Sequence, residues 1–558
     1  MSETTYRSIE HRPMRFSGGC VAAWVFGALV ATTGCHGLTT LQTITVNPST
    51  MPRIGAVDDR YQSYNVEMLE LTGGNFWKPY GPGLDTALRP PASSDQQDPG
   101  RESGTPSPDT PSGMNPALYQ YRPPIDLTDP RLRKLAAALG PAYVRVSGTW
   151  ANTTYFPETD QAPLTPPAGF KSVLSHAQWK GLIEFAKAVD AEIVTSFANG
   201  MGTRDPTGAW TTAQAERFLQ YTGSVGGRIA AAEFMNEPNL AAMGGAPDGY
   251  GALDFGRDFK TFASFARTES PDMLILGPGS VGETTGTWGV AYSGAPILKT
   301  RDLLAASRPV SVDAFSYHHY GATSQRCAAM GMQTTAQAAL SEEWLRRTDE
   351  TLAFYRTLRD EFQPGKPFWL TETADAACGG NPWARSFLDT FRYLDQLGRL
   401  AKQNVRVVAH NTLAASDYAL LDDRTFEPTP NYWAALLWHK LMGSIVFEPG
   451  VARREGLHVY AHCLRSRPGG VALLVINNGW TPATIELPIP SERYMLSAVN
   501  VTDTQVRLNG QALVLDAAGE LPDLRPTSIG PGIIDLAPAS VNFFALSQAG
   551  NSHCPGHA

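Results

Sequence analysis

From residue 64 to about residue 441, short apolar segments alternate with helical patterns, and this alternation constrains the fold of the 558-residue chain more than any other feature. It is typical of a parallel sheet whose strands are joined by helices. One helix is evident, because Trp179, Leu182 and Ile183 begin an apolar stripe after Ser175, a residue suited to the N-cap. Eight strands are expected, which is the number in a (β/α)8 TIM barrel. The predicted strands are 64–68, 143–146, 192–197, 229–234, 274–276, 314–317, 368–370 and 405–409.

The sequence predicts two domains, a barrel over residues 52–443 and a β-sandwich over residues 444–558. The last barrel helix is expected at 432–442, ended by Gly443. After it, apolar and polar residues alternate in short segments separated by Gly, Pro and Asn, which is typical of an antiparallel sandwich. A strand from about 41–46 is expected to complete this sandwich. The Pro- and Ser-rich residues 89–116 cannot form a core and are interpreted as a long loop after the first strand.

The N-terminal residues 1–35 have the order of an export signal. Arg12 and Arg15 precede an apolar run over 20–30 that is too short to span a bilayer comfortably. Gly34-Cys35 can end a lipoprotein signal, with plain cleavage as the alternative, because Thr32 stands where the lipoprotein motif prefers Leu. We therefore expect an exported protein that is periplasmic, extracellular, or tethered to a membrane through a lipidated Cys35.

The net charge and the spacing of the cysteines argue against a nucleic-acid partner and against a bound metal. The net charge of −8 argues against nucleic acid as a partner, because nucleic-acid sites need a basic surface. None of the six cysteines has metal-ligand spacing, so neither a metal nor another cofactor is expected.

Two glutamates are the main candidates for catalytic residues. Glu237 and Glu372 each follow a short apolar run that reads as a buried strand, and barrel enzymes place their chemistry at the carboxyl ends of the strands. A pair of carboxyl groups is what glycoside hydrolysis requires, one as acid and one as nucleophile. The alternative is that both are ordinary acids at loop starts. Glu233 is the main rival to Glu237, and its position inside the strand favours an interior carboxylate that orients its neighbours.

An ordered set of motifs makes the prediction more specific. The motifs are YQSYNVEM at 61–68, VRVSGT at 144–149, NEPN at 236–239, HHY at 318–320, WLTET at 369–373, DY at 417–418 and PNYW at 430–433. In this order they resemble glycoside hydrolase family 79, the β-glucuronidases and heparanases, over about residues 60–545.

The resemblance implies a retaining mechanism with Glu237 as general acid/base and Glu372 as nucleophile. The negative charge of Glu372 and partial burial are expected to raise the pKa of Glu237. For Glu67 the alternative is a structural ion pair at the bottom of the barrel, and for His318 it is a core histidine. The residues that the resemblance places in the substrate cleft are Glu67, Thr149, Asn236, His318, Tyr320, Gly379, Gly380 and Tyr418.

Two departures bear on the substrate. Ala377 stands where the family is expected to carry a tyrosine for the substrate's carboxylate, and Cys378 stands in place of a further glycine. The predicted function is a retaining, exo-acting β-glucuronidase that hydrolyses glucuronides or glucuronate-capped glycans without a cofactor. The alternatives are a retaining glycosidase of a related barrel family acting on a neutral sugar, and a non-catalytic carbohydrate-binding protein.

A disulfide is expected in the cleft. Cys327 follows the sixth predicted strand and Cys378 follows the seventh, and the loops after successive barrel strands lie side by side. Export would allow the two to be oxidised, and the alternative is a pair of buried free thiols. The sequence leaves the pairing of Cys463 and Cys554 open.

Overall fold

The computed structural model describes residues 43–88, 111, 114–288 and 297–555. The predicted signal with Cys35 and most of the loop predicted at 89–116 lie outside the described residues. Within the described part of the chain, no helix is both long enough and apolar enough to cross a membrane.

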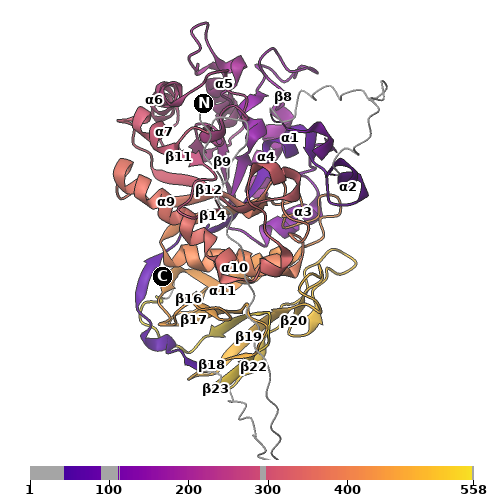
Figure 1. Ribbon diagram of the computed structural model, residues 1–558, viewed down its shortest axis with the longest axis vertical. Helices are drawn as coiled ribbons and strands as arrows, with labels where there is room; N and C mark the ends of the chain where they lie inside the picture. The colour runs from indigo at the N-terminus through magenta and orange to yellow at the C-terminus, as the bar shows by residue number, and fades with distance from the viewer. Residues whose placement is uncertain (1–42, 89–110, 112–113, 289–296, 556–558) are drawn as a thin grey trace, which may run out of the picture. The chain divides into compact units, whose positions relative to one another are not determined.

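Eight parallel strands close into a barrel, which confirms the predicted TIM-barrel class (Figure 1). Neighbours in the barrel follow chain order, and the last strand pairs with the first through Val408 and Gln62. The barrel strands are β3 (Gln62–Glu67), β6 (Ala142–Ser147), β9 (Ala191–Ser196), β10 (Ile229–Glu233), β11 (Leu274–Ser280), β12 (Ala314–Thr323), β13 (Phe368–Ala377) and β14 (Val405–His410).

Helices join the barrel strands. In α4 the predicted N-cap Ser175 accepts a hydrogen bond from the Gln178 amide, and Trp179, Leu182 and Ile183 are buried against the barrel. Apart from α1 (Met68–Thr72) and α2 (Pro82–Leu88), the α-helices between and after the barrel strands are α3 (Pro130–Ala137), α4 (His176–Ala188), α5 (Ala213–Ser224), α6 (Ala252–Glu269), α7 (Thr300–Ser307), α8 (Glu342–Leu345), α9 (Arg347–Phe362), α10 (Phe387–Lys402) and α11 (Pro430–Leu441).

Side chains from successive strands fill the lower barrel interior. Val194, Ala231, Leu276 and Val407 form a small apolar layer that Trp369 joins. Tyr143 packs on this layer with its ring 4.8 Å from that of Trp369. The lower interior is thus a packed core, and polar groups are left for the carboxyl end.

A hairpin interrupts the regular pattern between β3 and β6. It is formed by β4 (Gly74–Trp77) and β5 (Tyr119–Arg122), which pair antiparallel, and α1 (Met68–Thr72) and α2 (Pro82–Leu88) flank β4 in the chain. This hairpin was not predicted, and the loop expected at 89–116 lies between its two strands.

Antiparallel sheets follow the barrel. A nine-stranded sheet and a three-stranded sheet enclose an apolar cluster that includes Val459, Leu473 and Ile485. The nine-stranded sheet contains β2 (Arg53–Ala56), β15 (Met442–Phe447), β16 (His458–Leu464), β17 (Val471–Asn477), β19 (Ser491–Ser497), β20 (Arg507–Leu508), β21 (Gln511–Ala512), β22 (Thr527–Ile529) and β24 (Ser540–Leu546). The smaller sheet contains β1 (Ile44–Thr45), β18 (Ala483–Leu487) and β23 (Gly532–Leu536).

Two predicted boundaries are wrong. Residues assigned to the start of the barrel form β2, which pairs with β15 in the nine-stranded sheet. Gly443 does not end the last helix but lies inside β15, where a Cβ atom would come within 2.7 Å of the Cys463 carbonyl oxygen. Close approach of two strands therefore explains this glycine better than helix capping does.

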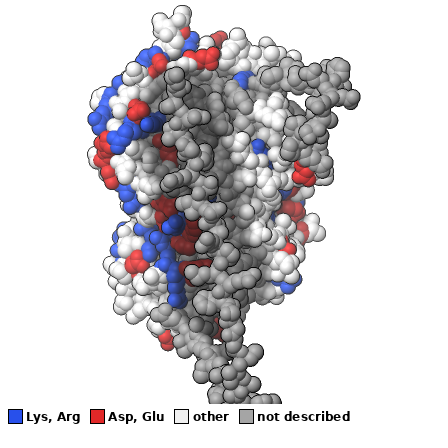
Figure 2. All heavy atoms as spheres, in the orientation of Figure 1, with Lys and Arg blue, Asp and Glu red and all other residues white. Residues whose placement is uncertain are grey.

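Helix α10 connects the barrel to the antiparallel sheet. Its residues from Phe387 to Ala401 are buried, and it contacts both β13 and β16. Asp395 of α10 accepts hydrogen bonds from His458 at 2.6 Å and Tyr460 at 2.5 Å, both on β16. On the face shown in Figure 2, acidic and basic side chains are interspersed along the flanks of the described surface.

Candidate active site

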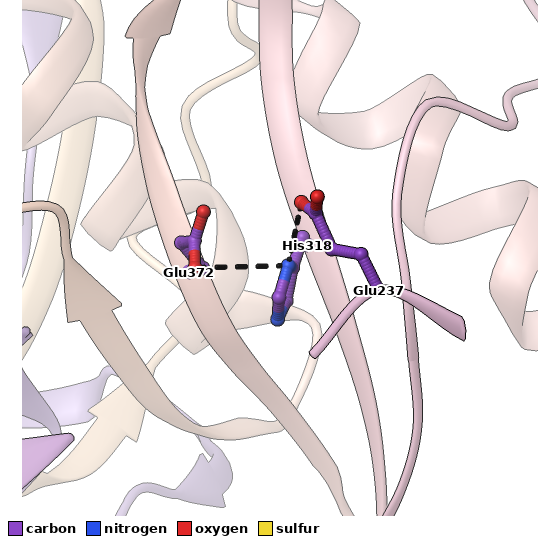
Figure 3. A group of neighbouring side chains, drawn as sticks. All are labelled: Glu237, His318 and Glu372. Atoms are coloured by element: carbon purple, nitrogen blue, oxygen red, sulfur yellow. Dashed lines mark hydrogen bonds and ion pairs between the residues drawn. The ribbon is translucent and has the colours of Figure 1, made fainter. Parts of the chain in front are cut away.

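Glu237 and Glu372 come together at the carboxyl end of the barrel. Glu372 lies in β13, and Glu237 lies four residues after the end of β10 and directly before the short 3-10 helix η5 (Pro238–Leu240). One carboxylate oxygen of each and one ring nitrogen of His318 lie within 4.8 Å of one another. Figure 3 shows His318 between the two carboxyl groups, with an interaction to each.

Donors hold Glu372 from two sides. Arg145 Nη1 donates to Oε2 at 2.8 Å, and the Tyr320 hydroxyl donates to Oε1 at 2.6 Å. A carboxylate that accepts such bonds is stabilised in its charged form. The geometry suits a nucleophile, because hydrogen-bond donors fix both carboxylate oxygens of Glu372 in place.

Glu237 is in the opposite electrostatic situation. Burial, followed by the negative charge of Glu372, raises the pKa of Glu237 well above its ordinary value. A carboxyl group that stays protonated near neutral pH suits the role of general acid. The two glutamates thus lie in different environments: donors surround the Glu372 carboxylate, and burial beside a negative charge acts on Glu237.

His318 fixes the orientation of the acid. Its Nδ1 lies 3.0 Å from Glu237 Oε1, and its Nε2 lies 3.2 Å from Arg145 Nη2. Burial and the charge of Arg145 hold the pKa of His318 well below its ordinary value, so the ring is neutral. Because arginine only donates, Nε2 must accept, and the proton is on Nδ1 facing Glu237. His318 is fully buried and does not line the pocket, where the sequence predicts a substrate contact.

Arg145 is the central residue that the sequence analysis did not assign. Its guanidinium also donates to Glu233 Oε2, at 3.1 Å from Nε and 2.8 Å from Nη2. Glu233 Oε1 accepts from Thr371 at 2.8 Å, so Glu233 is an interior carboxylate, as predicted. The sequence did contain a signal for Arg145, because a cation between Val144 and Val146 in a buried strand needs anionic partners inside the barrel.

The pocket above the two glutamates has a volume of about 640 Å³, which includes open solvent. It brings together four of the predicted contacts, Glu67, Thr149, Tyr320 and Tyr418. The hairpin and neighbouring loops supply much of the remaining wall. These further lining residues include Trp77, Pro111, Met114, Tyr119, Trp150, Leu240, Met243, Val281, Met330, Ala377, Cys378 and Asn411.

Asn411 connects several of these groups and was also missed. Its Nδ2 lies 3.1 Å from Glu67 Oε1 and 3.0 Å from the hydroxyl oxygens of both Tyr320 and Tyr418. Burial, and then the charge of Glu372, raise the pKa of Glu67 well above its ordinary value. Asn411 directly follows β14, so its position at a strand end was the available signal.

Besides His318, three other predicted contacts do not line the pocket. Asn236 lies just behind it, where its Oδ1 accepts from Arg145 at 2.9 Å. Gly379 and Gly380 are buried behind the wall, and the Gly380 amide donates to the Ala376 carbonyl. The glycine run expected to receive a carboxylate is therefore set back from the pocket, whose surface is formed by Ala377 and Cys378 instead.

The Cys327–Cys378 disulfide is present, with a Cα separation of 6.2 Å, and it joins the loops after β12 and β13. Beside it, Arg326 Nη1 donates to the carbonyl oxygens of Cys378 at 3.1 Å and Gly380 at 3.0 Å. Arg326 also donates to the Lys78 carbonyl oxygen, which ties the hairpin segment to this turn. A second disulfide joins Cys463 and Cys554, the pairing that the sequence left open.

The same three central side chains offer a set of metal ligands. Two carboxylates and an imidazole within 4.8 Å of one another could hold a divalent cation. Both oxygens of Glu372 and one oxygen of Glu237 already have hydrogen-bond partners, however. The donors around them therefore suit an acid and nucleophile pair.

Comparisons with known proteins place the chain among named relatives. No protein-family model matches it. It is 28% identical over 495 residues to heparanase-like protein 1 of Arabidopsis thaliana, which covers 77% of this chain and 86% of that protein. It is 27% identical to the hyaluronoglucuronidase of Hirudo nipponia, over 77% of this chain and 92% of that protein. Inactive heparanase-2 of Homo sapiens is 26% identical over 64% of this chain and 62% of that protein.

A solved structure supports the fold. The 4-O-α-L-rhamnosyl-β-D-glucuronidase of Fusarium oxysporum 12S superposes with a TM-score of 0.57 at 14% identity, covering 90% of this chain and all of that one. At this identity the match bears on the fold alone. The sequence relatives above agree with the resemblance noted from the motifs: the chain is similar to a heparanase-like protein and to a hyaluronoglucuronidase.

Proposed function

We propose that the chain is a glycoside hydrolase, and more specifically a retaining, exo-acting β-glucuronidase for glucuronides or glucuronate-capped glycans. One observation carries the proposal: an oxygen of Glu237 and an oxygen of Glu372 lie within 4.8 Å of each other at the floor of a pocket. Carboxyl groups about 5 to 5.5 Å apart are typical of retaining enzymes, whereas inverting enzymes need about 6.5 to 9.5 Å for a water molecule.

The proposed mechanism gives each glutamate one role. Glu237 donates its proton to the glycosidic oxygen while Glu372 attacks the anomeric carbon and forms a glycosyl-enzyme ester. Glu237, now a carboxylate, takes a proton from water, which hydrolyses the ester. The hydrogen bonds from Arg145 and Tyr320 to Glu372 weaken when Glu372 loses its negative charge in the ester. The hydrogen bond from His318 keeps Glu237 oriented in both steps.

Substrate class rests on the relatives and on the shape of the site. Two relatives are named as a heparanase-like protein and a hyaluronoglucuronidase, which supports a uronate-containing glycan. The aromatic residues Trp77, Tyr119 and Trp150 in the pocket wall suit stacking against a sugar ring.

The test compares aryl β-glucuronide, β-glucoside, β-xyloside and β-galactoside with one leaving group. We expect the highest kcat/KM for the glucuronide, and NMR should show the β-anomer of the sugar as the first product. A preference for a neutral glycoside would contradict the uronate proposal, and an α-anomer would contradict retention. Chelation with EDTA should leave the rate unchanged, because no step requires a metal.

A non-catalytic carbohydrate-binding protein is the second candidate, since inactive heparanase-2 is among the relatives. This chain has both glutamates with their donors in place, which binding alone does not need. Binding of glucuronides without turnover in the same assay would favour this candidate.

We also propose export, with Cys35 as a lipid anchor. The two disulfides support export, because disulfides persist in oxidising compartments. Cell fractionation with radiolabelled palmitate tests it, and Cys35→Ala should release the protein from membranes. A cytosolic location would contradict export.

A further inference from the structure

Trp77 on β4 and Tyr119 on β5 form an aromatic wall of the pocket. Their rings stack with centroids 4.5 Å apart and planes at 28°. Trp77 packs against the turn after β13, because a Cβ atom on Gly379 would lie 2.8 Å from Trp77 Cγ. The aromatic wall therefore stands beside Ala377 and Cys378, where the family resemblance predicts a tyrosine that this chain lacks.

The Tyr119 hydroxyl has no assigned role in the fold. The residue is 5% exposed, and its hydroxyl has no hydrogen-bond partner among the residues that the structure describes. Buried polar groups are normally paired, so an unpaired one in a pocket wall points to a ligand as the missing partner. Burial raises the pKa of Tyr119, so the hydroxyl keeps its proton, and the nearby positive charge of Arg326 makes it a stronger donor.

The remaining pocket wall offers no cation. Among the described lining residues there is neither Lys nor Arg, and Ala377 has no polar side-chain atom. A neutral donor is also chemically suited, because a further cation in the pocket would lower the pKa of Glu237.

We propose that Tyr119 is a specificity-determining residue whose hydroxyl donates a hydrogen bond to the carboxylate of the uronate bound in the pocket. The proposal rests on the proposed β-glucuronidase function. It means that the hairpin inserted between β3 and β6 supplies, from a different part of the chain, the donor that is absent at Ala377.

The experiment is Tyr119→Phe, which removes one oxygen atom and keeps the stacked ring. With aryl β-glucuronide and β-glucoside sharing one leaving group, we expect kcat/KM for the glucuronide to fall about tenfold or more, since the lost bond is to a charged acceptor. The value for the glucoside should stay within about twofold. Tyr121→Phe is the matched control, because Tyr121 lies on the same strand, is 68% exposed, and should change neither value.

An equal loss on both substrates would overturn the proposal, because it indicates a structural role or a contact to a shared hydroxyl group. An unchanged glucuronide rate would overturn it as well. Calorimetry with D-glucuronate and D-glucose gives a readout independent of turnover: Tyr119→Phe should weaken glucuronate binding alone. If the unmodified protein binds glucuronate but hydrolyses no glucuronide, the proposed function is wrong. The calorimetric comparison with Tyr119→Phe still tests the role of Tyr119 in that case. Absence of glucuronate binding by the unmodified protein counts against both.

Discussion

The Tyr320 hydroxyl donates to Glu372 Oε1 at 2.6 Å, and Asn411 Nδ2 lies 3.0 Å from the same hydroxyl oxygen. The hydroxyl is thus held between a donor and an acceptor, so its proton is directed at Glu372. With Arg145 on the other carboxylate oxygen, Glu372 is fixed from two sides before substrate arrives.

Tyr320→Phe should lower kcat by about a hundredfold and change KM little, because a preorganised donor to the reacting carboxylate is lost. Tyr317→Phe is the control. It lies on the same strand, and its buried hydroxyl has no hydrogen-bond partner in the described part of the chain. Steady-state kinetics on an aryl glucuronide measure kcat and KM for both variants. An effect of Tyr320→Phe confined to KM would contradict a role of Tyr320 in orienting Glu372.

The two glutamates should separate by the chemistry of the leaving group. Glu372→Ala should abolish turnover, and azide should partly restore it while giving a product of inverted configuration, because a small anion replaces the nucleophile. Glu237→Ala should keep activity on substrates with good leaving groups and lose it on poor ones. If Glu233→Ala shows this dependence and Glu237→Ala does not, the assignment of the acid is wrong.

Activity should fall on the alkaline side as Glu237 loses its proton. Burial and then the charge of Glu372 raise the pKa of Glu237, so the active acid form is present below that raised pKa and is lost above it. In Glu372→Gln the second cause is removed, and the titration of the Glu237 carboxyl should move to lower pH. Carbon NMR of labelled glutamate measures this shift, and an unmoved titration would mean that the two groups are not electrostatically coupled.

The two disulfides should differ in their functional effect. Removing Cys327–Cys378 or Cys463–Cys554, with sequence separations of 51 and 91 residues, should lower the free energy of unfolding by about 2 to 4 kcal/mol in each case. Only the first bridge borders the pocket, so only Cys327→Ser/Cys378→Ser should also raise KM. Denaturant unfolding and kinetics on both double variants test this. Equal KM values would show that the pocket wall does not depend on the bridge.

His458 should make stability depend on pH. Burial alone would lower its pKa, but the charge and hydrogen bonds of Asp395 with the bond to Glu342 raise it to about 9. Because the folded pKa exceeds the ordinary 6.5, the stabilisation is fully present below about pH 6.5 and is lost as pH rises through about 9. His458→Gln should therefore cost about 3 kcal/mol at pH 6 and much less at pH 10. Urea unfolding at both pH values measures the difference, and an equal cost would rule out a charged His458.

Much of the site was predictable from local pattern. Glu237, Glu372 and Tyr320 follow or occupy recognisable strands, and the carboxyl ends of barrel strands converge on one face whatever their sequence. The Cys327–Cys378 bridge followed from the same argument, because loops after neighbouring strands lie side by side. The hairpin of β4 and β5 was not predictable in this way, since its strands are separated by a long Pro- and Ser-rich stretch and pair only over four residues each.

The sequence by itself determined the barrel, the presence of two opposed glutamates and the antiparallel region that follows, because strand and helix periodicity is written into neighbouring residues. Only the tertiary structure decided which side chains hold those glutamates. Arg145 and Glu372 are 227 positions apart, and Asn411 and Glu67 are 344 apart. Such contacts depend on barrel register and on which side chains point inward, and a shift of one residue would turn each of them to the opposite face.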